Sequence, residues 1–302
     1  MKPAKTSLEA VSILIINYNS GEYLGRCLNS IFRNQSGAEV IVWDNASSDE
    51  SLILQRGVLD RIKLHRSSSN VGFSRAVNSG MALCSGKYIL LLNPDTEVNP
   101  DFLVPIVDFI SKRDRPCIVG GKVLNPNGSF EPACIRAIPT PGSAFTRLSG
   151  LARLFPASRR LPRYNLPDNR DTSPRKVGAI SGSFCMFHKE LCEEIRFDEE
   201  FFLFGEDLDF CFRAAKAGYE VWFLPTASVR HRKGVSMRIQ PVSSVFHFYD
   251  SMLKFHRKHY STGHSLAFNI MVFIGVWALA FPRIIGNIAA SPVRLVKASL
   301  EG

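Results

Sequence analysis

The chain has 302 residues, of which 45% are hydrophobic and 21% charged, and its formal net charge is +10. This composition is that of a globular protein with a substantial core, and it excludes a disordered, collagen-like or coiled-coil chain. Seven cysteines occur without a CxxC pair or a metal-type spacing, which disfavours a zinc module or a disulfide scaffold and suits a reducing cytoplasm. The first ten residues lack an apolar run, so we expect no secretory signal there.

The first 125 residues alternate between short apolar runs and stretches with helical spacing. Strands are predicted at Val11–Tyr18, Glu39–Asp44, Ile62–His65 and Tyr88–Leu92, and helices at Gly21–Phe32, Asp49–Leu59, Phe73–Cys84 and Asp101–Ser111. This alternation predicts a doubly wound, mostly parallel α/β sheet. No GxGxxG follows the first strand and no GxxxxGK[ST] occurs, which disfavours a dinucleotide fold and excludes a P-loop.

Polar residues stand where three of the predicted strands end. These exits are residues 17–19, 44–49 and 93–97. Ligands of such sheets bind beyond the carboxyl ends of the strands, so the exits predict the site. Asp95, with Glu97 two residues later, suits a hard divalent cation, because Mg²⁺ typically takes one or two carboxylates together with substrate phosphates.

In the second half of the chain, a basic, proline-rich stretch is followed by a segment with helical spacing. Residues 136–176 are basic and rich in proline, which predicts a long loop that is either a solvated linker or a lid or acceptor-binding loop. A helix is then predicted from Glu206 to about Ala217, with Asp209 and Arg213 spaced to pair on one face. Acidic residues in its first turn are explained equally by capping. The preceding aromatic run, residues 201–204, would partly desolvate a carboxylate and so favours a general base.

The C-terminal segment Arg230–Gly302 carries ten basic and two acidic residues and includes the uncharged stretch Leu266–Phe281. This pairing predicts association with an anionic membrane, to which Lys254, Arg257 and Lys258 would contribute. A full span needs about 20 apolar residues, so spanning the membrane and lying in its interface both stay open. A buried core helix is the alternative. Nucleic-acid binding is disfavoured because the aromatic residues are not interleaved with the cations.

Five motifs follow one another along the chain: VSILIINYN, VIVWDNASSDES, NVGFSRAVNSG, YILLLNPDTEV and FDEEFFLFGEDLDFCFRAAKAGYEVWFLPTASVRH. As an ordered set they resemble the family 2 glycosyltransferases with a GT-A fold, most closely the rhamnosyltransferase-like branch that builds bacterial surface polysaccharides. The resemblance covers Val11 to about His231. It implies a GT-A domain over residues 1–230, followed by a membrane-associating region at 231–302. Within the domain it implies a nucleotide-sugar-binding half at 11–125, the basic loop at 136–176 and an acceptor and catalytic half at 177–230.

The resemblance also implies an activity and its residues. The enzyme would transfer a sugar, rhamnose being one candidate, with inversion from a nucleoside diphosphate sugar to a hydroxyl of a saccharide or lipid-linked acceptor. It would work at the cytoplasmic face of the cell membrane, peripheral or anchored through its C-terminal region. Asp207 would be the catalytic base, with Glu206 beside it in an acceptor or supporting role. The implied nucleotide-sugar contacts are Asn17, Asn19, Asp44, Asn93 and Asp95, and the acceptor side would be lined by Gly182 and Ser183.

A divalent cation, Mn²⁺ or Mg²⁺, is implied with Asp95, His231 and Glu97 as ligands. The family's metal motif is Asp-x-Asp, and here Asn93 replaces its first carboxylate and brings no charge. Because His231 lies between Arg230 and Arg232, we expect a neutral imidazole near pH 7, which is the form that binds a metal.

Two further classes of function compete with this hypothesis. A sugar nucleotidyltransferase would need a glycine-rich basic loop after the first strand, and NYNSGEY is not one. A catalytically silent, membrane-tethered protein that binds nucleotide sugars is the non-enzyme alternative. The presence of both Asp95 and Asp207 argues against it, and an assay of nucleotide-sugar turnover separates the two.

Overall fold

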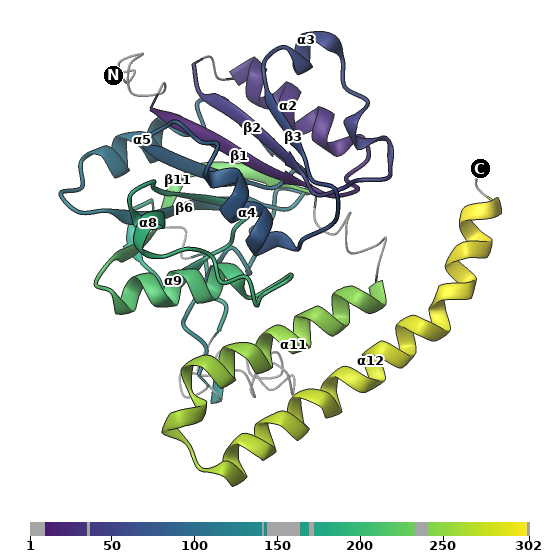
Figure 1. Ribbon diagram of the computed structural model, residues 1–302. Helices are drawn as coiled ribbons and strands as arrows, with labels where there is room; N and C mark the ends of the chain where they lie inside the picture. Colours follow the sequence, from purple (N-terminus) through teal and green to yellow (C-terminus); the bar gives the residue numbers. More distant parts are fainter. Residues whose placement is uncertain are drawn as a thin grey trace.

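The computed structural model describes residues 10–34, 37–140, 142–143, 164–168, 172–232 and 241–300, with the side chains of residues 241 and 289–300 outside that description. Most of the predicted basic loop, residues 141, 144–163 and 169–171, also lies outside the described residues. An α/β body and a C-terminal pair of helices make up the described chain (Figure 1).

A nine-stranded mixed sheet forms the centre of the body, in the order β3-β2-β1-β4-β10-β6-β11-β5, with β8 paired to β11. Its strands are β1 (Val11–Asn17), β2 (Glu39–Asp44), β3 (Lys63–Arg66), β4 (Tyr88–Leu92), β5 (Thr96–Val98), β6 (Cys117–Leu124), β8 (Arg175–Lys176), β10 (Phe184–His188) and β11 (Glu220–His231). The half β3-β2-β1-β4 is parallel, as predicted. The other half is mixed, because β10 runs antiparallel to both β4 and β6.

The apolar strands fill the middle of the sheet. Every residue of β1 and of β4 is buried, because both faces of these strands are covered. The edge strand β3, by contrast, has the sequence KLHR and is exposed along its length. Strand β11 is twelve residues long and passes Pro225 at an irregularity between Leu224 and Ser228. That length carries His231 to the end of the sheet next to β5.

Helices cover the sheet. They are α2 (Tyr23–Asn34), α3 (Arg56–Leu59), α4 (Phe73–Met81), α5 (Leu103–Ser111), α8 (Leu191–Glu194) and α9 (Glu206–Lys216). The single helix predicted over Asp49–Leu59 is wrong. The chain instead forms a 3-10 turn, Glu50–Leu52, and the short α3. The reason is that Asp49 caps this turn at Ser51 N and also accepts from Gly21 N, which ties the segment to the end of β1.

A small second sheet lies beside the first. It pairs β7 (Ile135–Arg136) with β9 (Ala179–Ile180) in antiparallel fashion. Ile180 packs so closely on β6 that a Cβ added to Gly120 would lie 2.0 Å from it. This contact fixes the small sheet against the large one and places Arg136 next to α9.

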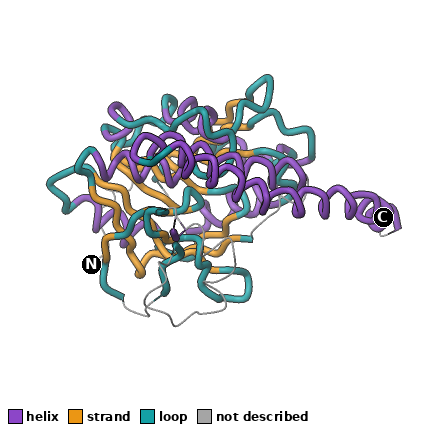
Figure 2. The backbone as a smooth tube through the Cα atoms, turned by 90° about the horizontal axis from the view of Figure 1, so that it is seen from below, coloured by secondary structure: helices purple, strands orange, loops and turns teal. Residues whose placement is uncertain are grey.

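The C-terminal region is a helical hairpin of α11 (Pro241–His259) and α12 (Leu266–Leu300), joined by a 3-10 turn at Ser261–Gly263. The two helices lie side by side along one face of the body, and the end of α12 projects beyond it (Figures 1 and 2). Residues Leu266–Ile288 are long and apolar enough to cross a membrane, with a mean hydropathy of 1.8. Only 11% of that window is buried, so the alternative of a buried core helix does not hold.

Candidate active site

The predicted strand exits meet at one edge of the sheet. Asn17 and Asp44 are in register at the ends of β1 and β2. The segment 181–183 leads into β10, whose antiparallel direction brings this segment to the end of β4. There the Asn93 N–H donates to the Ser183 carbonyl at 3.3 Å. The sheet topology therefore brings residues from the ends of four separate strands to one site.

Asn17 and Asp44 form a fully buried hydrogen-bonded pair. Asn17 Nδ2 donates to Asp44 Oδ1 at 2.8 Å, and the Ser47 hydroxyl donates to the same oxygen at 2.5 Å. Asp44 Oδ2 accepts from Ser47 N and lies 3.4 Å from Arg66 Nε. These contacts use the four acceptor positions of the carboxylate. Asp44, the predicted nucleotide contact, is therefore at the site, but its carboxylate points inward and holds the loop that follows β2.

Asn19 connects the first two strand exits. Its backbone adopts a left-handed conformation with φ of 47°, which asparagine tolerates better than most residues. Its side-chain oxygen accepts from Ser48 N at 2.8 Å and its own N–H donates to Ser47 Oγ at 3.0 Å. Asn19 thus holds the loop after β1 against the loop after β2.

Asp95 and His231 meet as predicted, and a second acidic residue joins them. His231 Nε2 lies 2.9 Å from Asp95 Oδ1, and His231 Nδ1 lies 3.2 Å from Glu131 Oε2. Asn93 Nδ2 is 3.4 Å from His231 Nε2. Glu131 is 3% exposed. The imidazole is therefore held between two carboxylates, with the Asn93 amide beside it.

The charge of His231 differs from the prediction. Burial acts to lower its pKa, but the hydrogen bonds to Asp95 and Glu131 outweigh burial and raise the pKa from 6.5 to about 9. The expectation of a neutral imidazole is therefore wrong for this arrangement. It failed because successive side chains of β11 point to opposite faces of the sheet, so Arg230 and Arg232 are turned away from the ring of His231.

This group fits a divalent cation with few protein ligands. The carboxylate of Asp95 and Nε2 of His231 provide one oxygen and one nitrogen, a pair that suits Mn²⁺. A bound cation would replace the proton that His231 holds between the two carboxylates. Within the described ranges, no three His, Cys, Asp or Glu side chains are grouped as a metal site. The substrate would therefore have to supply the remaining ligands, as phosphates do for Mg²⁺.

Glu97 is not brought to this group. It pairs in register with Arg230 on β11, whereas His231 pairs with Thr96. Directly paired residues of antiparallel strands share a face, so Glu97 lies on the face opposite His231. Its carboxylate is 3.5 Å from Arg232 Nε and half-buried.

Asp207 stands in the first turn of α9, after a backbone that turns sharply at Phe204 and Gly205, with φ of 68° and 78°. Its Oδ1 accepts from Leu208 N at 2.7 Å. Its Oδ2 accepts from Gly182 N at 3.0 Å and pairs with Arg136 Nη2 at 2.7 Å. Since each carboxylate oxygen accepts about two hydrogen bonds, Oδ1 keeps one position open.

Arg136 was not anticipated as a site residue. Its guanidinium is buried and also donates to the Ile180 carbonyl at 3.0 Å. Burial acts to lower its pKa, but Asp207 raises it well above the usual value, so Arg136 stays charged. In the sequence Arg136 begins a basic, proline-rich stretch, and a two-residue strand is too short to show periodicity. Glu131 gave no signal either, because its role depends on the register of the segment that follows β6.

Glu206, the residue before Asp207, lies in a different environment from that of Asp207. It is 7% exposed, and its Oε2 is buried without a hydrogen-bond partner in the described part of the chain. Burial, followed by the charge of Asp207, raises its pKa from 4.5 to about 8. The raised pKa favours the protonated form of Glu206 at neutral pH, beside Asp207, whose carboxylate Arg136 holds.

Gly182 and Ser183 connect the two charged groups. Gly182 N donates to Asp207, while the carbonyl of Ser183 accepts from Asn93, next to His231. Ser183 is buried and its hydroxyl lies 2.9 Å from that of Ser181. The segment predicted to line the acceptor side is thus the bridge between the Asp95–His231 pair and Asp207.

The sequence matches the family model for glycosyl transferase family 2 over residues 12–196, and that for glycosyl transferase family group 2 over residues 165–289. An N-acetylglucosaminyl-diphospho-decaprenol L-rhamnosyltransferase of Mycobacterium tuberculosis is 25% identical, over 78% of this chain and 80% of its own. The rhamnosyltransferase WbbL of Escherichia coli is 23% identical, over 73% and 83%. The hexosyltransferase Agl10 of Haloferax volcanii, named for low-salt glycan biosynthesis, is 28% identical, over 78% and 71%.

Solved structures show the same fold. The mannosyltransferase PcManGT from Pyrobaculum calidifontis, in complex with GDP-Man and Mn²⁺, has a TM-score of 0.57 at 15% identity, covering 96% of this chain and 80% of that one. GalNAc-T7 with UDP, GalNAc and Mn²⁺ also has a TM-score of 0.57, at 19% identity, covering 74% of this chain and 43% of that one. The predicted GT-A fold is confirmed. The protein is a glycosyltransferase, and it belongs to glycosyl transferase family 2, in the rhamnosyltransferase-like branch that its motifs indicated.

Proposed function

We propose that this enzyme transfers a sugar from a nucleoside diphosphate sugar to a hydroxyl of a saccharide or lipid-linked acceptor, by a single inverting displacement, in cell-surface polysaccharide synthesis. One observation carries the proposal: the Asp95–His231 pair and Asp207 lie at one edge of the sheet and are joined through Gly182 and Ser183. The relative from M. tuberculosis is named for an L-rhamnosyl transfer with a lipid-linked saccharide. That name supports rhamnose as a candidate sugar and a lipid-linked acceptor.

The donor side would be built on Asp95 and His231. These two residues would hold Mn²⁺ or Mg²⁺, and Glu131 would orient the imidazole from behind through Nδ1. When bound, such a cation supplies positive charge against the diphosphate oxygens of the donor. Both structural neighbours described above hold a nucleotide together with Mn²⁺, which supports this assignment.

The acceptor side would be built on Asp207. The free position on Oδ1 can accept the proton of the acceptor hydroxyl, while Arg136 and Gly182 N hold Oδ2 and fix the direction of the carboxylate. The acceptor oxygen then bonds to the anomeric carbon as the bond from that carbon to the diphosphate oxygen breaks. A double displacement would need a second, nucleophilic carboxylate. Glu206 is protonated at neutral pH, which favours the single displacement and therefore inversion.

The test is the variant Asp207→Asn, which keeps the shape of the side chain and removes the proton acceptor. We expect transfer to fall about 10²–10⁴-fold with donor binding retained. The matched control is Asp108→Asn, since Asp108 is a solvated aspartate on α5 that pairs with Lys112 one helical turn away. Release of nucleoside diphosphate would be measured with UDP-, dTDP- and GDP-sugars and Mn²⁺. Turnover at the wild-type level in Asp207→Asn would remove Asp207 as the base. A wild-type protein that binds a nucleotide sugar but never turns it over would establish the silent binding protein instead.

A further inference from the structure

The outward face of α12 is a continuous apolar stripe. It includes Leu266, Ile270, Phe273, Ile274, Phe281 and Ile285, each at least 50% exposed. At 3.6 residues per turn these positions fall within an arc of about 120°. No acidic residue occurs between Leu266 and Leu300. An exposed apolar surface of this extent marks an interaction site.

The opposite face of α12 packs against α11. Val276 and Ala280 are buried against Tyr249 in a small hydrophobic core between the two helices, separate from the main core. The rings of Phe246 and Trp277 are 5.8 Å apart, and Arg283 lies over the ring of Tyr249 at 5.6 Å. The charge of Arg283 is therefore directed toward α11, away from the apolar stripe.

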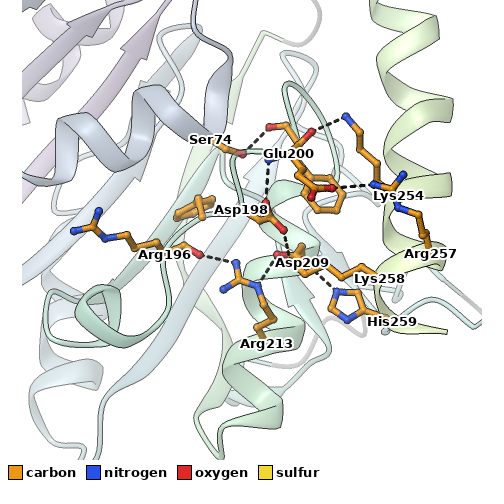
Figure 3. A network of polar contacts seen from close by, with 12 residues as sticks. Ser74, Arg196, Asp198, Glu200, Asp209, Arg213, Lys254, Arg257, Lys258 and His259 are labelled. Carbon is orange, nitrogen blue, oxygen red and sulfur yellow. Dashed lines mark hydrogen bonds and ion pairs between the residues drawn. The ribbon is translucent and has the colours of Figure 1, made fainter. Parts of the chain in front are cut away.

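Helix α11 is in turn fixed to the catalytic domain. Asp209 of α9 is fully buried and lies 2.9 Å from Lys258 Nζ and 2.7 Å from His259 Nε2. Arg257 pairs with Glu200, and Lys254 donates to the carbonyl of the same residue (Figure 3). Apolar contacts accompany these ion pairs, since Phe255 belongs to the main hydrophobic core. The cations predicted to face lipid thus bind the catalytic domain instead.

These contacts run along much of α11. Near its start the ring of His247 stacks on Phe202 at 4.7 Å, and at its end His259 reaches Asp209. Helix α11 therefore lies between the catalytic domain and α12. If α12 crossed a bilayer, α11 and the segment 198–205 would also lie within the hydrocarbon core, because they are attached to it. Their ion pairs would then be buried in lipid. Ionised groups at that depth cost several kcal/mol each.

From this layering we infer that α12 does not span the membrane but lies in the plane of its surface, with the apolar stripe in one leaflet of an anionic bilayer. The inference rests on the membrane setting of the proposed function and adds its topology. It places α9, and with it Asp207, one helix layer above the lipid surface, where a lipid-linked saccharide presents its hydroxyls. Helices with one apolar face and a basic flank bind membranes in this way.

Charge favours lipid over a second copy of the chain as the occupant of the stripe. Helix α12 carries the cations Arg283, Arg294 and Lys297 and no acidic residue, so a second copy would bring like charge to the contact. An anionic bilayer brings opposite charge. The stripe is also one helix wide, which is narrow for a stable dimer interface of at least about 1,000 Å².

Topology is the first test. The full-length protein would carry an N-terminal and a C-terminal epitope tag, and sealed membrane vesicles of known orientation would be treated with protease from one side. We expect both tags to be digested from the same side. Protection of the C-terminal tag while the N-terminal tag is digested would show a spanning α12 and overturn the inference.

Substitution of the stripe is the second test. Ile274→Asp combined with Phe281→Asp should lower binding to anionic liposomes at least tenfold, about 1.4 kcal/mol. The matched control is Ile53→Asp, because Ile53 is 79% exposed in the segment between the 3-10 turn Glu50–Leu52 and α3. Unchanged liposome binding, or a change from dimer to monomer in its place, would refute the lipid assignment. Turnover with a soluble acceptor is measured in parallel. Loss of turnover would contradict the proposed function, whereas a change in liposome binding alone concerns only the inference that α12 lies on the membrane.

Discussion

Glu206 offers a quantitative test of the electrostatics of the site. Its folded pKa is about 8 against an ordinary value of 4.5, because the side chain is buried and Asp207 is close. Between these two pH values the folded state keeps the proton and the unfolded state has lost it. Stability therefore falls as the pH rises through this window, by about 1.4 kcal/mol per pH unit.

The variant Glu206→Gln isolates this effect, because glutamine has nearly the same shape and no proton to lose. We expect its free energy of unfolding to exceed that of the wild type increasingly with pH. The difference should grow by about 3–4 kcal/mol between pH 5 and pH 8, and it should level off above pH 9. Urea unfolding of both proteins, followed by tryptophan fluorescence at each pH, measures that difference directly.

The same variant separates the roles of the two neighbouring acids. If Glu206 acts as a protonated donor, the glutamine amide replaces that donor and most transfer at pH 7 should survive. Stability curves of wild type and Glu206→Gln that stay parallel from pH 5 to pH 9 would refute the reasoning, since they would mean that Glu206 is ionised in the folded enzyme.

Three further predictions concern the other charged groups. His231→Ala should raise the Mn²⁺ concentration for half-maximal activity at least tenfold, about 1.4 kcal/mol. Glu97→Gln should leave this Mn²⁺ titration unchanged. If both variants raised the Mn²⁺ requirement equally, Glu97 would belong to the metal site. Arg136→Met should destabilise the fold by about 3–5 kcal/mol, because it leaves the partly buried carboxylate of Asp207 without its cation; an unchanged melting temperature would contradict that. Lys258→Met should cost less stability than Asp209→Asn, because Asp209 keeps Arg213 and His259 as partners; the reverse order in thermal unfolding would exclude Asp209 as the centre of the contact.

The parts of the fold that follow from local pattern were predictable. Strands β1 and β4 are near-continuous apolar runs, and the exits Asn17 and Asn93 follow directly from them. The start of α9 was also predictable, because acidic residues gather in its first turn and Arg213 pairs with Asp209 at 2.6 Å. These features depend on residues that lie close together in the chain, so they can be recognised in the sequence itself.

What failed depends on contacts between distant segments. The helix predicted over Asp49–Leu59 is broken because Asp49 also binds Gly21 N at 2.7 Å, 28 positions away. The charge of His231 was misjudged because its neighbours in the chain are arginines, whereas its neighbours in space are Asp95 and Glu131. The metal, base and acceptor assignments stay predictions, although the structure brings all of their residues except Glu97 to one edge of the sheet.

One short segment supports both charged groups of the site. Glu131 holds the imidazole of His231, and Arg136, a few residues later, holds the carboxylate of Asp207. The pairing of β7 with β9 fixes this segment, and Ser181 N donates to the carbonyl of Cys134 within it. Arg136 is also the first residue of the basic stretch 136–176, which was predicted to be a solvated linker, a lid or an acceptor-binding loop. Residues 131–136 therefore support the predicted donor side of the site and its predicted acceptor side at the same time.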